Sequence, residues 1–156
     1  MKILVKLYKE QVIPQIISKG DFIDLRYCGE PIRMKHGDFQ VLPLGVAMKL
    51  PEGYEAIVVS RSSTYKNFSI FNPGGFGVID NTYNGDTDEW KYPAYCLGER
   101  AYIQPGDRIC QFKIQLSQKA TIWQKIKWLF SNKIEFKQVD SLSEISRGGL
   151  GSTGKC

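Results

Sequence analysis

Residues 105–116 read Pro105-Gly106-Asp107-Arg108-Ile109-Cys110-Gln111-Phe112-Lys113-Ile114-Gln115-Leu116. The first three residues are a turn signal, and apolar and polar residues alternate after them. Because successive side chains of a strand point to opposite faces, the apolar residues from Cys110 to Leu116 share one face. Gln111 lies on the other face, so this strand is predicted to present Gln111 rather than bury it.

The same alternation recurs in other parts of the chain. Ile3, Val5 and Leu7 alternate with lysines, and Tyr54, Ala56 and Val58 follow the turn signal at 51–53. Short segments of this kind between turn signals are typical of an all-β sandwich or barrel. A length of 156 residues fits one such domain. The predicted architecture is therefore a single all-β domain.

The composition is that of a folded protein, with 42% hydrophobic and 24% charged residues. The net charge of +5 would suit a polyanionic partner, but the basic residues are scattered along the chain. Small anionic ligands such as phosphates are therefore favoured over direct nucleic-acid binding. No apolar run approaches the ~18 residues that a transmembrane helix requires, so we expect a cytoplasmic protein without a membrane partner.

Cysteine and histidine are too sparse for several kinds of site. The four cysteines are widely separated without a Cys-x-x-Cys pair, and His36 is the single histidine. This pattern argues against a structural zinc site. Cys28 and Cys110 are predicted to be small core residues on strands. His36 lies in a turn-like segment without a triad signature, which argues against a Ser-His-Asp or Cys-His hydrolase.

One stretch, residues 121–130, breaks the β pattern. Ile122, Ile126 and Leu129 have helical spacing, Trp123 and Phe130 widen the apolar stripe, and Lys125 and Lys127 lie opposite. The stretch predicts one short amphipathic helix. We expect this helix to pack against its own sheet, and a membrane-surface or partner-binding role is the alternative.

The tail from Arg147 to Gly154 combines an arginine, several glycines and two hydroxyl groups. Its glycines lose much backbone entropy on ordering, so the tail is predicted to be mobile until it meets a ligand or a partner. Arginine, closely approaching backbone N–H groups and hydroxyls are also the groups that grip a triphosphate. A disordered terminus is the alternative.

Three internal segments carry similar chemistry. Arg61-Ser62-Ser63 places a cation beside hydroxyls that suit phosphate oxygens. The segment 77–85 places Asp80 after an apolar pair and Tyr83 three residues later, and the segment 106–111 is a turn into the strand quoted above. Each segment alone is a weak signal, since arginine-serine pairs are common in loops and a lone aspartate in a turn is usually structural.

Taken in order, these segments resemble the five motifs of the trimeric dUTPase family. Asp24-Leu25 resembles the end of the first motif, and the segments at 61–63, 77–85, 106–111 and 147–154 resemble the second to the fifth. The resemblance covers nearly all of the chain. The segments 62–67 and 93–95 are most similar to members from Gram-positive bacteria and their phages.

The resemblance implies a distorted jelly-roll at residues 1–142, with an insertion at about 118–134, and a mobile C-terminal arm at 143–156 that closes the active site. It implies a homotrimer with active sites at subunit interfaces. The implied reaction is hydrolysis of dUTP to dUMP and pyrophosphate, which keeps uracil out of DNA and supplies the precursor of dTMP. Mg²⁺ is the implied cofactor, since it takes few protein ligands and fills its shell with phosphate oxygens and waters.

The resemblance also implies a role for each matching residue. Asp80 is the catalytic residue that orients and deprotonates the attacking water, and Asp24 contacts Mg²⁺ through water. Tyr83 lies beneath the deoxyribose and excludes UTP. The other substrate-binding residues are Arg61, Ser62, Ser63 and Gln111 at the phosphates, Gly74, Gly77, Val78 and Ile79 around uracil, and Arg147, Leu150, Gly151, Ser152 and Thr153 in the arm.

The chain departs from the family pattern in ways that bear on alternatives. The usual Ala-Gly before Asp24 is absent, and Leu150 stands where the family has a phenylalanine that stacks on uracil. A dCTP deaminase, which shares the fold, would have its catalytic glutamate where this chain has Trp90, and Glu89 is one residue off. A nucleotide-sensing regulator that keeps the same pocket is the other alternative.

Overall fold

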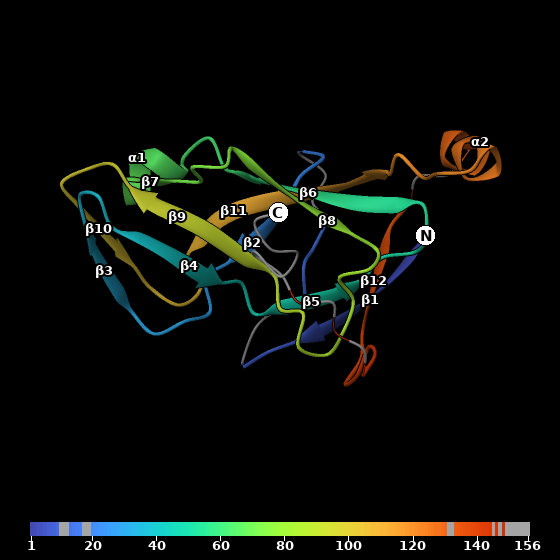
Figure 1. Ribbon diagram of the computed structural model, residues 1–156, viewed down its shortest axis with the longest axis horizontal. Helices are drawn as coiled ribbons and strands as arrows, with labels where there is room; N and C mark the ends of the chain where they lie inside the picture. The colour runs from blue at the N-terminus through green and yellow to red at the C-terminus, as the bar shows by residue number, and fades with distance from the viewer. Residues whose placement is uncertain (10–12, 17–19, 131–132, 145, 147, 149–156) are drawn as a thin grey trace, which may run out of the picture.

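The computed structural model describes residues 1–9, 13–16, 20–130, 133–144, 146 and 148. Figure 1 shows an elongated molecule built mainly of strands. The strands are β1 (Lys2–Leu7), β2 (Ile23–Arg26), β3 (Ile32–Lys35), β4 (Phe39–Pro43), β5 (Val46–Lys49), β6 (Tyr54–Ser60), β7 (Ile70–Phe71), β8 (Phe76–Asp80), β9 (Lys91–Cys96), β10 (Arg100–Ile103), β11 (Arg108–Leu116) and β12 (Glu135–Gln138). The helices are α1 (Thr64–Phe68) and α2 (Ile122–Phe130).

The strands form four small sheets in the described part of the chain. Their strand orders are β12-β1-β5, β10-β3, β2-β11-β6-β8 and β4-β9-β7. Every pair is antiparallel except β1 with β12, which are parallel. In Figure 1 the sheet that contains β6 and β11 lies above the sheet that contains β1 and β5. The all-β prediction is confirmed.

The core lies between these sheets and is filled by the apolar faces of alternating strands. Phe112 on β11 is fully buried, and its ring contacts Trp90 at a centroid distance of 5.2 Å and Phe136 on β12 at 6.1 Å. The buried residues of β1 and β6, and those of β11 from Cys110 onward, are those that the alternation predicts. Because each buried aromatic ring removes a large apolar area from water, Phe112 joins two sheets that share no strand pairing.

The alternation in β11 is interrupted once. Ile109 and Cys110 are both fully buried, and the register with β2 shifts between Arg108 and Cys110. In a β-bulge, two consecutive residues of one strand lie opposite a single residue of the partner strand. The bulge thereby changes the face to which the following side chains point. From Cys110 onward the predicted alternation holds, and Gln111 is partly exposed.

The prediction for Cys28 is correct in part. Cys28 is buried, but it follows β2 instead of lying on a strand, and its thiol contacts Glu89 Oε1 at 3.4 Å. Burial and the nearby Glu89 carboxylate raise the pKa of the Cys28 thiol to about 11. Cys110 lies on β11 in the core, as predicted, and His36 is exposed.

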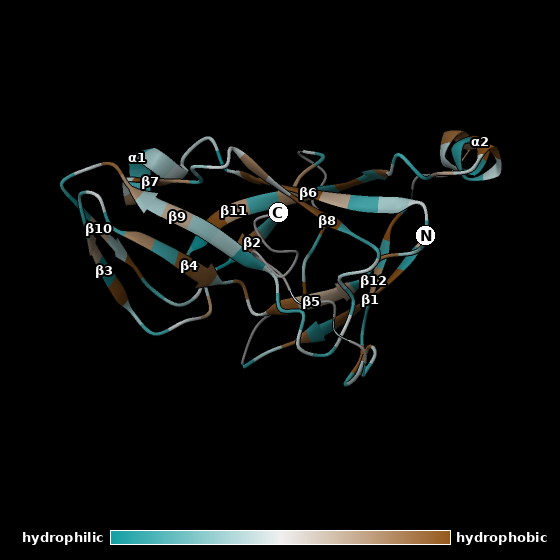
Figure 2. Ribbon diagram, viewed as in Figure 1, coloured by the Kyte–Doolittle hydropathy of each residue, from teal (hydrophilic) through white to brown (hydrophobic). Residues whose placement is uncertain are grey.

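The helix predicted at 121–130 is present as α2, but the expectation that its apolar stripe packs against its own sheet is wrong. Trp123, Leu129 and Phe130 are 75%, 82% and 87% exposed. Figure 1 shows α2 at one end of the molecule, and Figure 2 shows hydrophobic residues along its ribbon. In the part of the chain that the structure describes, no helix has the length and apolar character needed to cross a membrane.

Candidate active site

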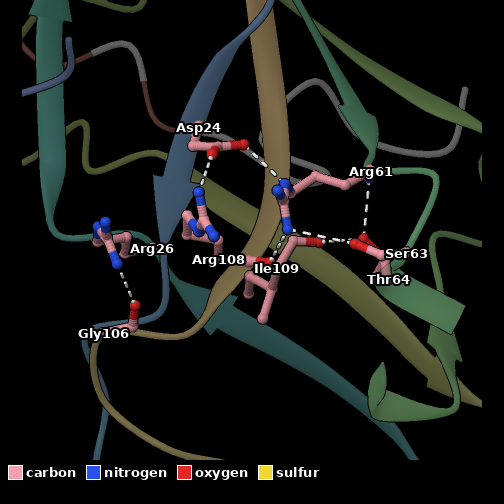
Figure 3. A network of polar contacts seen from close by, with 8 residues as sticks. All are labelled: Asp24, Arg26, Arg61, Ser63, Thr64, Gly106, Arg108 and Ile109. Carbon is pink, nitrogen blue, oxygen red and sulfur yellow. Dashed lines mark hydrogen bonds and ion pairs between the residues drawn. The ribbon is translucent and has the colours of Figure 1, made fainter. Parts of the chain in front are cut away.

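Asp24 on β2 lies between two arginines (Figure 3). Its Oδ1 is 2.7 Å from Nε of Arg61, and its Oδ2 is 3.0 Å from Nη1 of Arg108. Arg61 follows β6 and Arg108 begins β11, so three neighbouring strands bring these charges together. Because charge-assisted hydrogen bonds are short and directional, Asp24 orients both guanidinium groups.

Thr64 anchors the loop that carries Arg61. The Thr64 side chain is fully buried; its Oγ1 accepts from the backbone N–H of Arg61 at 2.8 Å and donates to the carbonyl of Ile109 at 2.9 Å. Arg61 Nη1 also donates to Ser63 Oγ at 3.3 Å. The predicted phosphate residues Arg61 and Ser63 are thus neighbours in space, and the exposed Ser62 lies between them in the chain.

Gln111 shares the sheet face of Asp24. It lies opposite Asp24 in the β2–β11 ladder and opposite Val59 in the β6–β11 ladder. Residues directly opposite one another in antiparallel strands point to the same face. The structure therefore brings Asp24, Arg61 and Gln111 to one end of one sheet.

This end of the sheet carries an excess of positive charge. Arg26 lies opposite Arg108 in the ladder and donates to the carbonyl of Gly106 at 2.8 Å. Arg26 therefore adds a third arginine to the end of the sheet where Arg61 and Arg108 bind Asp24, and fixed cations in excess suit phosphate oxygens. Arg108 lies within the segment 106–111, but the sequence alone predicts no role for it. The sequence signal that could have indicated a binding role is a positive charge directly after the turn.

No group of three or more His, Cys, Asp or Glu side chains that could hold a metal ion occurs among the described residues. A metal enclosed by protein ligands is therefore not a feature of this region. Among the described residues, the carboxylate paired with Arg61 and Arg108 is that of Asp24. That donor set fits an ion such as Mg²⁺, which takes most of its ligands from phosphates and waters.

Asp80 ends β8 and begins a tight turn. Its Oδ1 accepts from the backbone N–H of Thr82 at 2.8 Å and from the Thr82 hydroxyl at 2.5 Å. An aspartate that binds the backbone two residues further on forms an Asx turn, which fixes the direction of the carboxylate.

Tyr83 follows in the same turn and is partly buried against the core. Its hydroxyl donates to the carbonyl of Glu89 at 3.0 Å. Burial raises the pKa of the Tyr83 phenol, and the carboxylates of Asp88 and Glu89 raise it further. The Tyr83 phenol is therefore neutral, and the hydrogen bond of its hydroxyl fixes the position of the ring. A ring fixed in this way can form a rigid surface for a ligand.

Asp80 lies far from the arginine cluster along the sheet. It pairs with Glu55 on β6, whereas Gln111 lies opposite Val59, four residues further along the same strand. At about 3.3 Å per residue, this offset amounts to roughly 13 Å. The predicted site residues therefore form two groups within one chain.

The segment predicted to surround uracil is an edge strand. Within the described residues β8 pairs on one side only, with β6, and it carries Gly77, Val78 and Ile79. The outward N–H and C=O groups of an edge strand remain available to a ligand. Before β8, Asn72 Oδ1 accepts from the backbone N–H of Gly74 at 2.9 Å, so the Asn72 side chain shapes the turn.

Asp86 joins the Asp80 loop to the segment before the arm, a contact that sequence reasoning missed. Its carboxylate accepts from the backbone N–H of Leu142 and from Ser141 Oγ, both at 2.7 Å, and lies 3.3 Å from Lys6 Nζ. These partners, the Leu142 N–H most strongly, lower the pKa of Asp86 to about 2. Asp86 and Leu142 are far apart in the sequence, and no short-range sequence pattern predicts that they are in contact.

Asp88 makes a second connection of the same kind. It is buried, and it accepts from the backbone N–H of Gly85 at 2.8 Å and from the hydroxyl of Ser146. Asp86 and Asp88 together hold the chain where the predicted arm begins. The arm residues of the prediction, Arg147, Leu150, Gly151, Ser152 and Thr153, lie outside the described residues.

Glu89 and Trp90 do not provide the chemistry that a deaminase needs. Trp90 is fully buried in the core. Glu89 Oε1 accepts from the backbone N–H of Gly45 at 2.9 Å and contacts the Cys28 thiol. The carboxylate of Glu89 is therefore engaged in holding the fold together.

Known proteins resemble this chain over most of its length. The dUTPase family model matches residues 23–154. A prophage-derived deoxyuridine 5'-triphosphate nucleotidohydrolase of Bacillus subtilis strain 168 is 47% identical over 138 residues, which cover 88% of this chain and 87% of the relative. The deoxyuridine 5'-triphosphate nucleotidohydrolase of Finegoldia magna is 31% identical, and the match covers 99% of both chains.

Solved structures show the same fold. The dUTPase of Streptococcus mutans has a TM-score of 0.67 at 17% identity, with 75% of this chain and 98% of that chain covered. A point mutant of the dUTPase from the Staphylococcus aureus phage phi11, in which a structural Mg(II) ion is coordinated, has a TM-score of 0.66 at 18% identity, with 77% and 94% covered. The predicted jelly-roll fold and the predicted similarity to Gram-positive and phage proteins are confirmed. With the family model spanning most of its length, this chain belongs to the dUTPase family, whose members hydrolyse dUTP.

Proposed function

We propose that the protein hydrolyses dUTP to dUMP and pyrophosphate with Mg²⁺, at active sites shared between the subunits of a homotrimer. One observation carries the proposal beyond family membership. Asp80 and Gln111 are separated by roughly 13 Å along one sheet face, too far for one triphosphate to reach both within a chain without help from another copy. Residues of two copies that meet at an interface would complete the site.

Asp80 is the proposed general base. Its Oδ1 is held by Thr82, so the carboxylate keeps one direction toward the water that attacks the α-phosphorus. A positioned base of this kind accelerates a reaction about 10²- to 10⁴-fold. The proton of the attacking water goes to the Asp80 carboxylate as the new P–O bond forms and pyrophosphate leaves.

Arg61, Ser62, Ser63 and Gln111 are the proposed phosphate ligands from the neighbouring copy. Arg61 is oriented in advance by Asp24 and Thr64, so it need not reorganise when substrate arrives. Asp24 would contact the water shell of the Mg²⁺ ion that accompanies the triphosphate, and this ion would neutralise charge on the phosphates.

Uracil would be recognised by the backbone edge of β8 at Gly77, Val78 and Ile79 and by the turn at Gly74. An edge strand offers donors and acceptors in a fixed order, which matches one base and leaves polar groups unpaired with another. Tyr83, anchored through Glu89, would lie beneath the deoxyribose and leave no room for a 2′-hydroxyl. Leu150 would cover the base without stacking on it.

Arg147, Gly151, Ser152 and Thr153 would close over the phosphates as a C-terminal arm. Asp86 and Asp88 support this assignment, because they hold Ser141, Leu142 and Ser146 beside the loop that carries Asp80 and Tyr83. The product dUMP would serve as the precursor of dTMP, and removal of dUTP would keep uracil out of DNA. A cytoplasmic location stays a prediction.

The first test is pyrophosphate release from dUTP with Mg²⁺, beside dCTP, dTTP and UTP. We expect rapid release from dUTP alone and loss of release when Mg²⁺ is chelated. Absence of release from dUTP would overturn the proposed activity.

Subunit sharing is tested by complementation. Asp80→Asn and Gln111→Ala chains carry different affinity tags and are expressed together, and mixed trimers are purified through both tags. If Asp80 and Gln111 of one site come from different copies, the mixed trimers regain activity that each variant lacks alone. Mixed trimers as inactive as the two parents would place both residues in one chain's site and contradict the shared site.

A further inference from the structure

Helix α2 is anchored to the body of the protein by one side. Thr121 and Gln124 form a capping box, in which the Thr121 N–H donates to Gln124 Oε1 at 2.7 Å and the Gln124 N–H donates to Thr121 Oγ1 at 3.3 Å. Gln124 Nε2 also donates to the carbonyl of Glu52 at 2.8 Å. The Trp128 ring lies 5.6 Å from the ring of Tyr54. Gln124 and Trp128 therefore face the body.

Gly53 allows this close approach. It has a φ of +82°, and a Cβ at this position would lie 2.3 Å from Gln124 Oε1. A side chain here would be strained by the positive φ and would displace the amide group of Gln124. The loop at 52–53 is therefore shaped to receive the helix.

The opposite side of α2 is apolar and exposed. At about 100° per residue, Ile122, Ile126 and Leu129 fall within roughly 60° of one another, with Trp123 and Phe130 along one edge. Ile122 is 64% exposed and Ile126 is 37% exposed, and the other three are more than two-thirds exposed. This stripe is centred about 180° from Gln124 and Trp128.

Lysines flank the apolar stripe on both edges. Lys125 and Lys127 lie about 100° to either side of its centre, instead of opposite it as expected from the sequence. Lys119 and Lys133 lie in the flanking segments. The chain contains no aspartate or glutamate between Asp107 and Glu135, so α2 and its flanks carry positive charge alone.

From this geometry we infer that α2 binds the surface of a lipid bilayer that carries anionic headgroups. The apolar stripe enters the boundary between headgroups and acyl chains, and the lysine stems extend back toward the headgroup phosphates. A flat surface reaches the outward half of a helix whose other half is docked on the protein.

The proposed trimer would strengthen this binding. Cyclic symmetry places the three copies of α2 at the same height along the threefold axis. After one helix binds, the other two are held near the same surface, so their effective concentration is high.

The inference is tested with the full-length protein and sedimented vesicles. One preparation contains phosphatidylcholine alone, and the other contains equal parts of phosphatidylcholine and phosphatidylglycerol. We expect binding to the anionic vesicles that decreases at high salt, because salt screens the lysine contribution. Trp123 emission should shift to shorter wavelength on binding, whereas Trp90 is already buried.

Variants identify the surface that binds. Leu129→Gln combined with Phe130→Gln should reduce partition into anionic vesicles by about tenfold or more, and Lys125→Gln combined with Lys127→Gln should do the same. Leu97→Gln, at a leucine that is 48% exposed outside α2, and Lys91→Gln are matched controls that should bind as the unaltered chain does. All variants should hydrolyse dUTP at the rate of the unaltered chain in vesicle-free buffer. The lipid inference, which is separate from the proposed activity, can therefore fail without affecting that activity.

Binding that both α2 variants retain would overturn the inference. So would a protein that stays in the supernatant with both kinds of vesicle, which would leave the stripe to a protein partner. If the α2 variants change the sedimentation coefficient of the protein without lipid and no vesicle binding occurs, the stripe belongs to a contact between copies, and the lipid inference is also wrong.

Discussion

Asp24 and Asp80 are carboxylates on the same sheet, yet they are held in different ways. Asp24 is bound by arginines that lie far from it in sequence, from the start of β11 and the end of β6. Asp80 accepts from Thr82, its near neighbour in the chain. Among the contacts described above, the proposed phosphate end is therefore built by tertiary contacts within one chain, whereas the proposed catalytic end is shaped by a local turn. Four predictions probe this contrast.

The largest effect is expected at the catalytic end. Asp80→Asn keeps an oxygen that can accept from Thr82 but removes the proton acceptor. We expect the rate of pyrophosphate release to fall by about 10²- to 10⁴-fold while dUTP binding, measured by calorimetry, persists. Asp140→Asn, at an exposed aspartate, is the control and should be neutral. A rate close to that of the unaltered chain would remove Asp80 from the role of base.

Thr64→Val tests whether the phosphate end depends on tertiary anchoring. The buried hydroxyl satisfies the Arg61 N–H and the Ile109 carbonyl, and each unsatisfied group costs about 1 to 3 kcal/mol. We expect a lower free energy of unfolding in urea and a higher KM for dUTP. Thr64→Ser keeps the hydroxyl, so its free energy of unfolding should fall much less. Equal stability of the valine and serine variants would show that the anchor is dispensable.

Arg108→Gln tests the second contact of Asp24. The Arg108 side chain is half exposed, so its ion pair is screened, and we expect a rise in KM of roughly threefold to tenfold with little change in kcat. Arg100→Gln, at an exposed arginine on β10, is the matched control. Combination with Asp24→Asn should be non-additive, since both changes break one contact. Additive effects would mean that the two residues act separately.

The smallest effect concerns the connection between the Asp80 loop and the arm. Folding lowers the pKa of Asp86 from 3.8 to about 2, so the charged form is favoured by its partners in the folded state. This contribution to stability is fully present above about pH 4 and is lost as the pH falls toward 2. Near neutral pH, the Asp86→Asn variant should therefore unfold at a lower temperature than the unaltered chain. In acid, the two unfolding temperatures should become equal. A difference that stays constant with pH would contradict this assignment.

Local patterns predict much of this molecule. Alternation in Arg108–Leu116 predicts both a strand and the exposure of Gln111, because strand geometry alone sends neighbouring side chains to opposite faces. Helical spacing in 121–130 predicts α2 for the same kind of reason. The bulge at Ile109 is not predicted. Two consecutive apolar residues do not indicate whether the strand pairing shifts at that point.

Motif order predicts which residues form the site but not their partners. The sequence alone predicts the all-β class and the family, which are both confirmed, because these depend on residue type and short spacing. The roles of Asp80, Arg61 and Gln111 stay predictions. Three features depend on contacts between distant segments. They are the pairing of Asp24 with Arg61 and Arg108, the attachment of Leu142 and Ser146 to Asp86 and Asp88, and the outward direction of the α2 stripe. Such contacts are selected by the free energy of packing the whole chain, which no local pattern contains.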